Sequence, residues 1–129
     1  MNLANNNITG STPASICKLA ALEEMTFQGN TEMEGSIPPC LGDCTNLTRI
    51  DYTRTTLRGT IPAGLCALEK LRKLMFQFTT GLTGTILDCL GAIQPMLKWV
   101  LLEGNMLEGT IPGVCGGEKE SPRLWAVPA

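Results

Sequence analysis

Histidine is missing from the 129-residue sequence, and this absence removes several kinds of catalytic and metal site. A nucleophile activated by histidine, whether serine or cysteine, cannot form. The six cysteines do not form a zinc pattern, because no second close pair follows Cys40 and Cys44 and no histidine completes a ligand set. No phosphate-binding loop occurs, since Gly116-Gly117 is not followed by Lys and then Ser or Thr. The sequence therefore predicts no enzyme activity, no metal and no cofactor.

Long apolar runs and an excess of positive charge are also missing. No run approaches the roughly 18 residues of a membrane span, and the formal net charge is −2. We therefore expect neither direct membrane contact nor a nucleic acid partner. Aromatic residues make up only 5% of the chain against 43% hydrophobic residues, so aliphatic side chains should fill the core. The first residues lack the basic and apolar segments of a signal peptide, and we expect the chain to be a piece of a longer protein.

A six-residue motif that recurs five times organises the sequence. The third copy reads Leu57-Arg58-Gly59-Thr60-Ile61-Pro62. The marker glycines of the five copies, spaced by 25, 24, 25 and 25 residues, are Gly10, Gly35, Gly59, Gly84 and Gly109. A fixed period of this length predicts one supersecondary unit per repeat, stacked into a solenoid.

Counting from each marker glycine predicts the structure of one coil. Large residues stand 15 and 17 positions after the glycine, which is the alternation of a half-buried strand. The first set is Met25, Ile50, Leu74, Trp99 and Leu124, and the second is Phe27, Tyr52, Phe76, Leu101 and Ala126. Apolar residues at 6, 9 and 12 positions after the glycine suit a 3₁₀ turn. We therefore expect Leu74 and Leu101 to be buried between neighbouring coils.

The run from Ile37 to Ile50 reads Ile-Pro-Pro-Cys-Leu-Gly-Asp-Cys-Thr-Asn-Leu-Thr-Arg-Ile and closely resembles the plant-type leucine-rich repeat. The resemblance covers residues 1–115. It implies a right-handed α/β solenoid of about five repeats of 24–25 residues. A parallel sheet would line the concave face, and short helical or 3₁₀ segments would lie on the convex side. After Gly109 the register fades, and residues 116–129 are predicted to be an irregular C-terminal tail in which residues 124–127 are a candidate cap strand.

One polar column departs from the family pattern. The family uses an asparagine to bond the backbone of each turn, and Asn6 and Asn30 match it. The same column elsewhere holds Thr55, Thr79 and Gly104. The ladder is therefore predicted to be incomplete, because a glycine has no side-chain donor.

The six cysteines allow 15 pairings. We expect mostly reduced, buried thiols that behave as small hydrophobic residues. Cys17 with Cys40, and Cys66 with Cys89, nevertheless lie on adjacent coils, where they are placed to approach bonding distance.

The resemblance extends to the extracellular parts of plant receptor-like kinases, receptor-like proteins and polygalacturonase inhibitors. It implies a module that binds a protein or peptide on its concave sheet, in an extracellular protein or the ectodomain of a plasma-membrane protein. Two other functions stay open, a structural spacer or scaffold segment and an inhibitor of a secreted cell-wall hydrolase. Asn7 and Asn46 stand in glycosylation sequons, which support secretion only weakly.

Side-chain alternation along the strands predicts which residues cover the concave face. The candidate partner-binding residues are Arg49, Asp51, Thr53, Lys73, Met75, Gln77, Phe78, Lys98, Val100 and Leu102. Arg49, Lys73 and Lys98 are expected to stack as a basic column. The apolar members of the set, Met75, Phe78, Val100 and Leu102, are expected to form a patch beside it. Such a surface suits an acidic or C-terminal-carboxylate peptide, and the alternative is a solvated face with scattered apolar residues.

Overall fold

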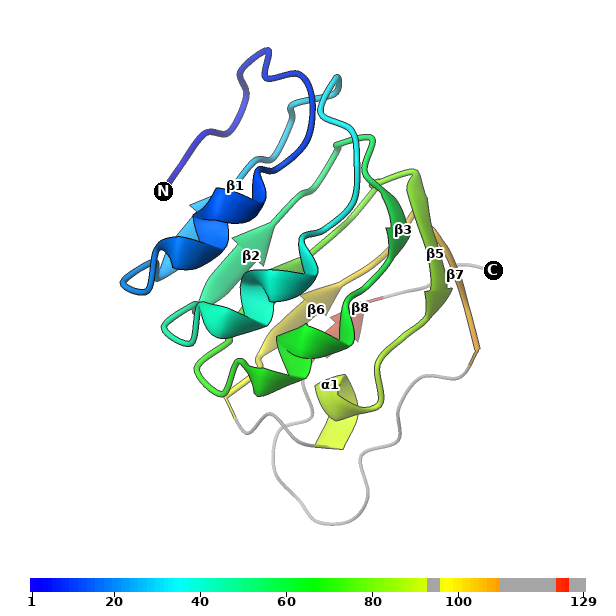
Figure 1. The fold of residues 1–129 in the computed structure, drawn as a ribbon. Coiled ribbons are helices and arrows are strands. Elements are labelled where there is room, and N and C mark those ends of the chain that lie inside the picture. The colour runs from blue at the N-terminus through cyan, green and yellow to red at the C-terminus, as the bar shows by residue number, and fades with distance from the viewer. Residues whose placement is uncertain (93–95, 110–122, 126–129) are drawn as a thin grey trace.

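The computed structural model describes residues 1–92, 96–109 and 123–125, and in it the chain winds through successive coils of a solenoid (Figure 1). One parallel sheet has the strand order β1-β2-β4-β6-β8. Its strands are β1 (Glu24–Thr26), β2 (Arg49–Asp51), β4 (Lys73–Met75), β6 (Trp99–Leu101) and β8 (Arg123–Trp125). The predicted parallel sheet on one side of a solenoid is confirmed, and its solvent-facing side is called the concave face below.

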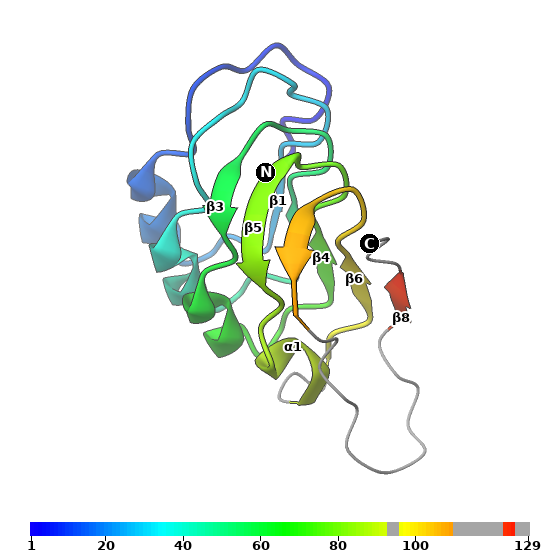
Figure 2. The same cartoon turned by 90° about the vertical axis from the view of Figure 1, so that its right-hand side faces the viewer.

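The other sides of each coil are formed by a second sheet and by short helical segments. The second sheet is parallel and has the order β3-β5-β7, with strands β3 (Arg58–Thr60), β5 (Gly81–Thr85) and β7 (Met106–Glu108). Among the described residues, the helical segments are three 3₁₀ helices, η1 (Ala14–Lys18), η2 (Pro39–Asp43) and η3 (Ala63–Ala67), and one α-helical turn, α1 (Cys89–Ala92). Figure 2 shows the second sheet in front of the first, with the helical segments along one side. Among the described helices, none is long and apolar enough to cross a membrane.

The marker glycines lie in or beside the strands of the second sheet, with Gly59 in β3, Gly84 in β5 and Gly109 directly after β7. All five have positive φ angles, between 76° and 93°, a range in which other residues are strained. Space is restricted as well, because a Cβ on Gly84 would stand 2.9 Å from the Thr60 methyl group of the preceding coil. The repeated glycine therefore has a conformational cause in all five copies, to which close packing is added at Gly35 and Gly84.

The core is a continuous column between the two sheets and the helical segments. Met25, Ile50 and Leu74 point inward from β1, β2 and β4 and have no exposed surface. Behind them the rings of Phe27, Tyr52 and Phe76 form a stack, with centroid distances of 5.2 and 5.9 Å. Three of the six aromatic residues in the sequence thus form one row of the core.

The Tyr52 hydroxyl is the polar end of this aromatic row. It lies 2.9 Å from the Thr12 hydroxyl, and both groups are buried. Burial raises the pKa of the Tyr52 phenol, and the hydrogen bond to Thr12 lowers it by less. The phenol therefore stays neutral and hydrogen-bonded inside the solenoid.

The register of strand β6 differs by one residue from the register predicted from the motif. Leu74 pairs with Val100, and Met75 pairs with Leu101. Val100 is only 1% exposed and Leu102 is 2% exposed, whereas Trp99 is 38% exposed. The prediction that Trp99 and Leu101 point inward was wrong, and so was the placement of Val100 and Leu102 on the concave face.

The cause is one additional residue in the connection that leads to β6. The inward residue follows its marker glycine by 15 positions in three coils, from Gly10 to Met25, Gly35 to Ile50 and Gly59 to Leu74. From Gly84 to Val100 the distance is 16 positions. Because side chains alternate, a shift of one residue exchanges the inward and outward sets of the whole strand.

This register gives a direct stability test. Leu74→Ala should lower the free energy of unfolding by about 2–5 kcal/mol, as expected for a large core residue. Leu101→Ala should cost about 1 kcal/mol or less, because the side chain is half-buried on the concave face. Urea unfolding of both variants measures the difference, and equal losses would contradict the pairing of Leu74 with Val100.

A polar ladder closes the turns after β1, β2, β4 and β6 of the concave sheet. The Asn30 side-chain amide donates to the carbonyl oxygens of Leu3 and Phe27 at 2.9 and 2.6 Å. Thr55 and Thr79 each donate a hydroxyl to the Tyr52 carbonyl oxygen, at 2.8 and 2.9 Å. The next member is Asn105, which donates to Phe76 and Leu102. The prediction that Gly104 interrupts the ladder was therefore wrong, for the same one-residue shift.

Two disulfides join neighbouring helical segments. Cys17 of η1 is bonded to Cys40 of η2, and Cys66 of η3 is bonded to Cys89 of α1. The expectation of mostly reduced thiols was wrong for these four residues, although the two pairs are those that adjacent coils bring together. Cys44 is free and buried, and burial followed by the nearby Asp43 charge raises the pKa of its thiol. Cys115 lies outside the described residues.

No disulfide joins η2 to η3, and these two segments meet through their backbones instead. A Cβ on Gly42 would lie 2.3 Å from the Gly64 carbonyl oxygen, and a Cβ on Gly64 would lie 2.8 Å from the Pro39 carbonyl oxygen. Glycine at both positions allows this close approach.

At the C-terminal side, β8 pairs in parallel with β6. The boundary predicted at residue 115, and most of the tail predicted for residues 116–129, fall outside the described ranges and stay predictions.

Candidate partner-binding surface

The concave face is built from side chains that alternate with the core residues of the sheet. The first outward column contains Glu24, Arg49, Lys73 and Trp99, which are direct neighbours in the strand pairing. The second contains Thr26, Asp51, Met75 and Leu101. The backbone register continues these columns with Arg123 and Trp125 of β8. From β2 to β6 the residues in both columns change from charged to apolar.

On the β2 coil, the face is an internally bonded polar cluster. A guanidinium nitrogen of Arg49 lies 2.7 Å from the Asp51 carboxylate, which has no exposed surface. The same carboxylate accepts a hydrogen bond from the Thr53 amide at 3.0 Å. Asp51 and Thr53, both predicted to meet a partner, are therefore buried groups that fix this part of the sheet. Within the described residues, Nε of Arg49 and the Thr53 hydroxyl are buried without a hydrogen-bond partner.

On the β4 and β6 coils, the face is apolar. Met75 and Leu101 are half-buried, whereas Trp99 and Phe78 are 38% and 46% exposed. We call Met75, Phe78, Trp99 and Leu101 the apolar patch. The sequence predicted a patch in this region, but two of its expected members, Val100 and Leu102, lie in the core. The inward shift of those two brings Trp99 and Leu101 to the surface.

Phe78 is held in an unusual backbone conformation at the strand-exit edge of the patch. Its φ angle is 53°, in the left-handed region that large side chains seldom adopt. The ring lies over Gly104 of the next coil, where a Cβ would stand 2.4 Å from Cδ1 of Phe78. The same turn position has a positive φ angle in the other coils, at Asn5, Gly29, Arg54 and Gly104, so this conformation belongs to the repeat. Beside it, the Gln77 amide donates to the Glu103 carboxylate at 2.5 Å.

The strand-entry edge of the same two coils carries exposed cations. Arg72 and Lys73 precede the inward residue of β4, and the Lys98 amide donates to the Arg72 carbonyl oxygen at 2.9 Å. Lys98 therefore lies beside Arg72 and not in the predicted column with Arg49 and Lys73, where Trp99 stands instead. We call Arg72, Lys73 and Lys98 the cation cluster.

The architecture of this chain is similar to that of several known proteins. A family model described as Leucine Rich Repeat matches residues 1–19. The ectodomain of the Arabidopsis thaliana receptor kinase GASSHO1/SCHENGEN3, solved with CASPARIAN STRIP INTEGRITY FACTOR 2, aligns with a TM-score of 0.81 and 29% identity. The plant peptide hormone receptor RGFR1, solved with RGF2, aligns with a TM-score of 0.80 and 30% identity. This chain has the fold of plant-type leucine-rich-repeat ectodomains, and its first repeat matches the family model. No curated protein sequence matches it.

The repeats cover only part of these relatives. The alignments include 87% and 85% of this chain but 13% and 17% of the two receptor chains. A plant ice-binding protein has the same fold, with a TM-score of 0.72, 30% identity and coverage of 77% of this chain and 31% of that one. Leucine-rich-repeat coils thus occur in proteins with very different ligands, and function has to be argued from the surface.

The two sequons differ in their surroundings. Asn7 is exposed, and its side chain makes no hydrogen bond within the described part of the chain. The Asn46 side-chain amide donates to the Ala20 carbonyl oxygen at 2.9 Å, and its oxygen accepts from Lys70 at 2.6 Å. Asn7 is therefore the more accessible of the two glycosylation candidates.

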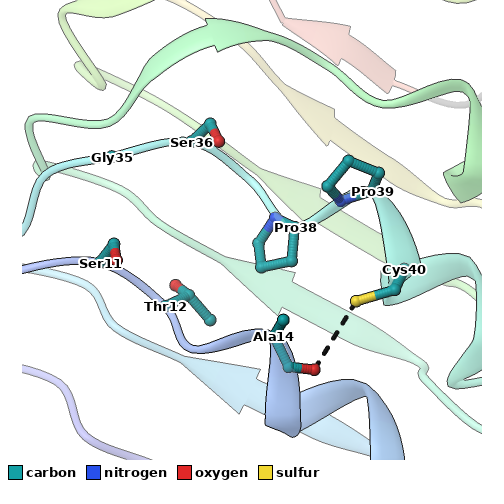
Figure 3. Close-up of a pocket in the computed structure, with 8 residues that line it drawn as sticks. All are labelled: Ser11, Thr12, Ala14, Gly35, Ser36, Pro38, Pro39 and Cys40. Atoms are coloured by element: carbon teal, nitrogen blue, oxygen red, sulfur yellow. Dashed lines mark hydrogen bonds between the residues drawn. The ribbon is translucent and has the colours of Figure 1, made fainter.

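A hollow of about 460 Å³ lies on another side of the solenoid, between η1 and η2 (Figure 3). Its lining residues are Ser11, Thr12, Ala14, Gly35, Ser36, Pro38, Pro39 and Cys40. Sγ of Cys40 lies 3.7 Å from the Ala14 carbonyl oxygen, but it has no proton to donate because it is in a disulfide. The lining contains no charged group, and no cluster of metal-ligating side chains occurs among the residues described.

Proposed function

We propose that this chain is a protein- or peptide-binding leucine-rich-repeat module of an extracellular receptor-like or secreted protein, and that its partner lies on the concave face. The apolar patch carries this proposal. It presents four large apolar side chains on two adjacent coils, and one of them is a tryptophan. Tryptophan is over-represented among residues that dominate binding energy, and contiguous exposed apolar surface marks interaction sites.

Two further observations support the proposal. The relative RGFR1 is a plant peptide hormone receptor that was solved with RGF2, so the repeat fold is suited to peptide recognition. Two disulfides join the helical segments, and stable disulfides are typical of secreted and extracellular proteins. An enzymatic role has no support, since the surface offers an apolar patch and solvated charges in place of a catalytic group with a base beside it.

Selection of dodecamers from a random peptide display library against the whole chain tests this proposal. The enriched peptides are then synthesised, and their affinities are measured by fluorescence anisotropy. Trp99→Ala should weaken binding by about 30-fold or more, the loss of roughly 2 kcal/mol that defines a dominant contact. Met106→Ala is the matched control, because Met106 is a large apolar residue, 57% exposed, on β7 of the other sheet.

The control should change affinity by less than about twofold. A loss in Met106→Ala with none in Trp99→Ala would move the binding site to the second sheet. Failure to enrich any peptide would favour the spacer or scaffold function. The third possibility, an inhibitor of a cell-wall hydrolase, would be supported if the folded chain slowed such an enzyme and Trp99→Ala removed the effect.

A further inference from the structure

The cation cluster lies at the strand-entry edge of the concave sheet, beside the apolar patch, and its positive charge is not compensated within the described residues. Arg72, Lys73 and Lys98 are all exposed, and none has an ion-pair partner within 4.0 Å in the described ranges. Arg49, which the sequence grouped with two of them, is already paired with Asp51 at 2.7 Å. A partner's carboxylate would therefore compete with Asp51 at Arg49 but would meet three free cations at the neighbouring coils.

The arrangement of the cluster is unfavourable in the free chain. Adjacent parallel strands lie about 4.8 Å apart, and Arg72 and Lys98 stand on such neighbours, joined by a backbone hydrogen bond of 2.9 Å. Like charges directly opposite one another destabilise a sheet by a few tenths of a kcal/mol when solvated. This local positive charge stands out in a chain whose formal net charge is −2. An acidic ligand group would relieve the repulsion.

The cluster is continuous with the apolar patch. Lys73 and Trp99 are paired neighbours, and Met75 and Leu101 form the next outward pair along the same two strands. From Lys73 to Phe78 the chain advances by five residues, which is at most about 17 Å at the rise of a strand. At the far end, the strand-exit edge of these coils carries Glu103 and Phe78. On these two coils, negative charge on the partner is therefore favoured at the entry edge and disfavoured beside Glu103 at the exit edge, whereas the exposed Arg54 stands at the exit edge of the neighbouring β2 coil.

We infer that the partner is an extended acidic segment of a protein, in which carboxylates lie against Arg72, Lys73 and Lys98 and apolar side chains cover the apolar patch over about five residues. This inference rests on the proposed function of the concave face and specifies the chemistry and the orientation of what binds there. The carboxylates speed association and orient the bound segment, since exposed charge pairs contribute more to association rate and specificity than to affinity. The apolar side chains supply most of the affinity.

The peptides enriched in the selection described above also test this inference. We expect Asp or Glu at two or more positions next to an apolar run. The double variant Arg72→Ser, Lys98→Ser should weaken their binding by about tenfold at low salt and flatten its dependence on ionic strength. The double variant Arg58→Ser, Lys18→Ser is the matched control, since it removes one exposed arginine and one exposed lysine from β3 and η1. It should leave both quantities unchanged. Circular dichroism and thermal unfolding confirm that both variants fold.

The outcomes separate this inference from the proposed function. Enriched peptides that lack acids, or equal losses in the two double variants, would overturn the acidic-segment inference. The concave-face proposal would then still stand if Trp99→Ala weakened binding. If Trp99→Ala had no effect, both would fail. An acidic polysaccharide, sodium alginate, is a competitor in the same assay. Full displacement of the peptide at equal carboxylate concentration would assign the cluster to polyanions and overturn the inference.

Discussion

Replacement of the four bonded cysteines by alanine is expected to lower the free energy of unfolding by about 6–7 kcal/mol. Each disulfide links residues 23 positions apart, Cys17 to Cys40 and Cys66 to Cys89. A loop of this length contributes about 3 kcal/mol by restricting the unfolded chain, on the chain-entropy model. Domains of this kind are stable by only about 5–15 kcal/mol. The variant should therefore be largely unfolded at 37 °C.

Urea unfolding followed by far-ultraviolet circular dichroism measures this loss. The double variant Cys17→Ala, Cys40→Ala should show about half of it. Cys44→Ala is the control, because Cys44 is buried but unbonded and its loss removes only a small side chain. Intact mass should rise by four hydrogens on full reduction, two for each disulfide. A total loss below about 2 kcal/mol for the four substitutions would show that the disulfides do not hold the helical segments together.

Tyr52→Ala should lower the free energy of unfolding by about 3–5 kcal/mol. Tyr52 is fully buried and is the middle ring of the row, with neighbours at 5.2 and 5.9 Å on either side. Removal of the ring opens a cavity between two coils and separates Phe27 from Phe76. In a solenoid each coil packs only on its neighbours, so no distant element can fill this space.

Tyr52→Phe separates the ring from its hydroxyl. The phenylalanine keeps both ring contacts but leaves the buried Thr12 hydroxyl without its 2.9 Å partner. We expect a loss of about 1–2 kcal/mol, the cost of an unsatisfied buried hydroxyl. Chemical denaturation of the two variants gives the comparison. If the phenylalanine variant lost as much as the alanine variant, the hydrogen bond and not the ring stack would dominate at this site.

The solenoid itself could be predicted because its determinants are local and repeated. Gly59 and Gly84 mark a backbone step that only glycine makes without strain, and the motif around them recurs at a nearly constant period. Inward residues such as Ile50 and Leu74 followed from side-chain alternation counted from those glycines. Where the connection kept its length, the predicted positions agree with the structure.

The details of the concave face depended on information that the motif does not contain. Lys98, Val100 and Leu102 were placed outward because the count assumed a connection of constant length, and one extra residue before β6 moved Trp99 and Leu101 to the surface. The burial of Asp51 depends on the reach of the Arg49 side chain two residues away. Alternation places both on the same face, but it cannot tell a bonded pair from two free charges.

The disulfides were missed for a related reason. The sequence identified Cys17 with Cys40 and Cys66 with Cys89 as neighbours, but proximity alone does not distinguish a thiol pair from a bond. The distance between Cα atoms, 5.8 and 5.7 Å, lies within the range that a disulfide spans. That distance is set by how tightly the helical segments stack, and stacking is a tertiary property.

The extra residue before β6 has a consequence for how such a surface changes over time. An insertion or deletion in the connection between Leu90 and Leu97 advances or delays the strand by one position and exchanges its ligand-facing set for its core-facing set. Recognition can then be altered by a change of length far from the ligand, with every strand residue conserved. The strand tolerates the exchange because both sets in residues 99–102 are apolar, Trp99 and Leu101 on one side and Val100 and Leu102 on the other. In a strand that is hydrophobic on both faces, the insertion or deletion of one residue in the preceding connection can therefore create a new binding surface while the core stays apolar.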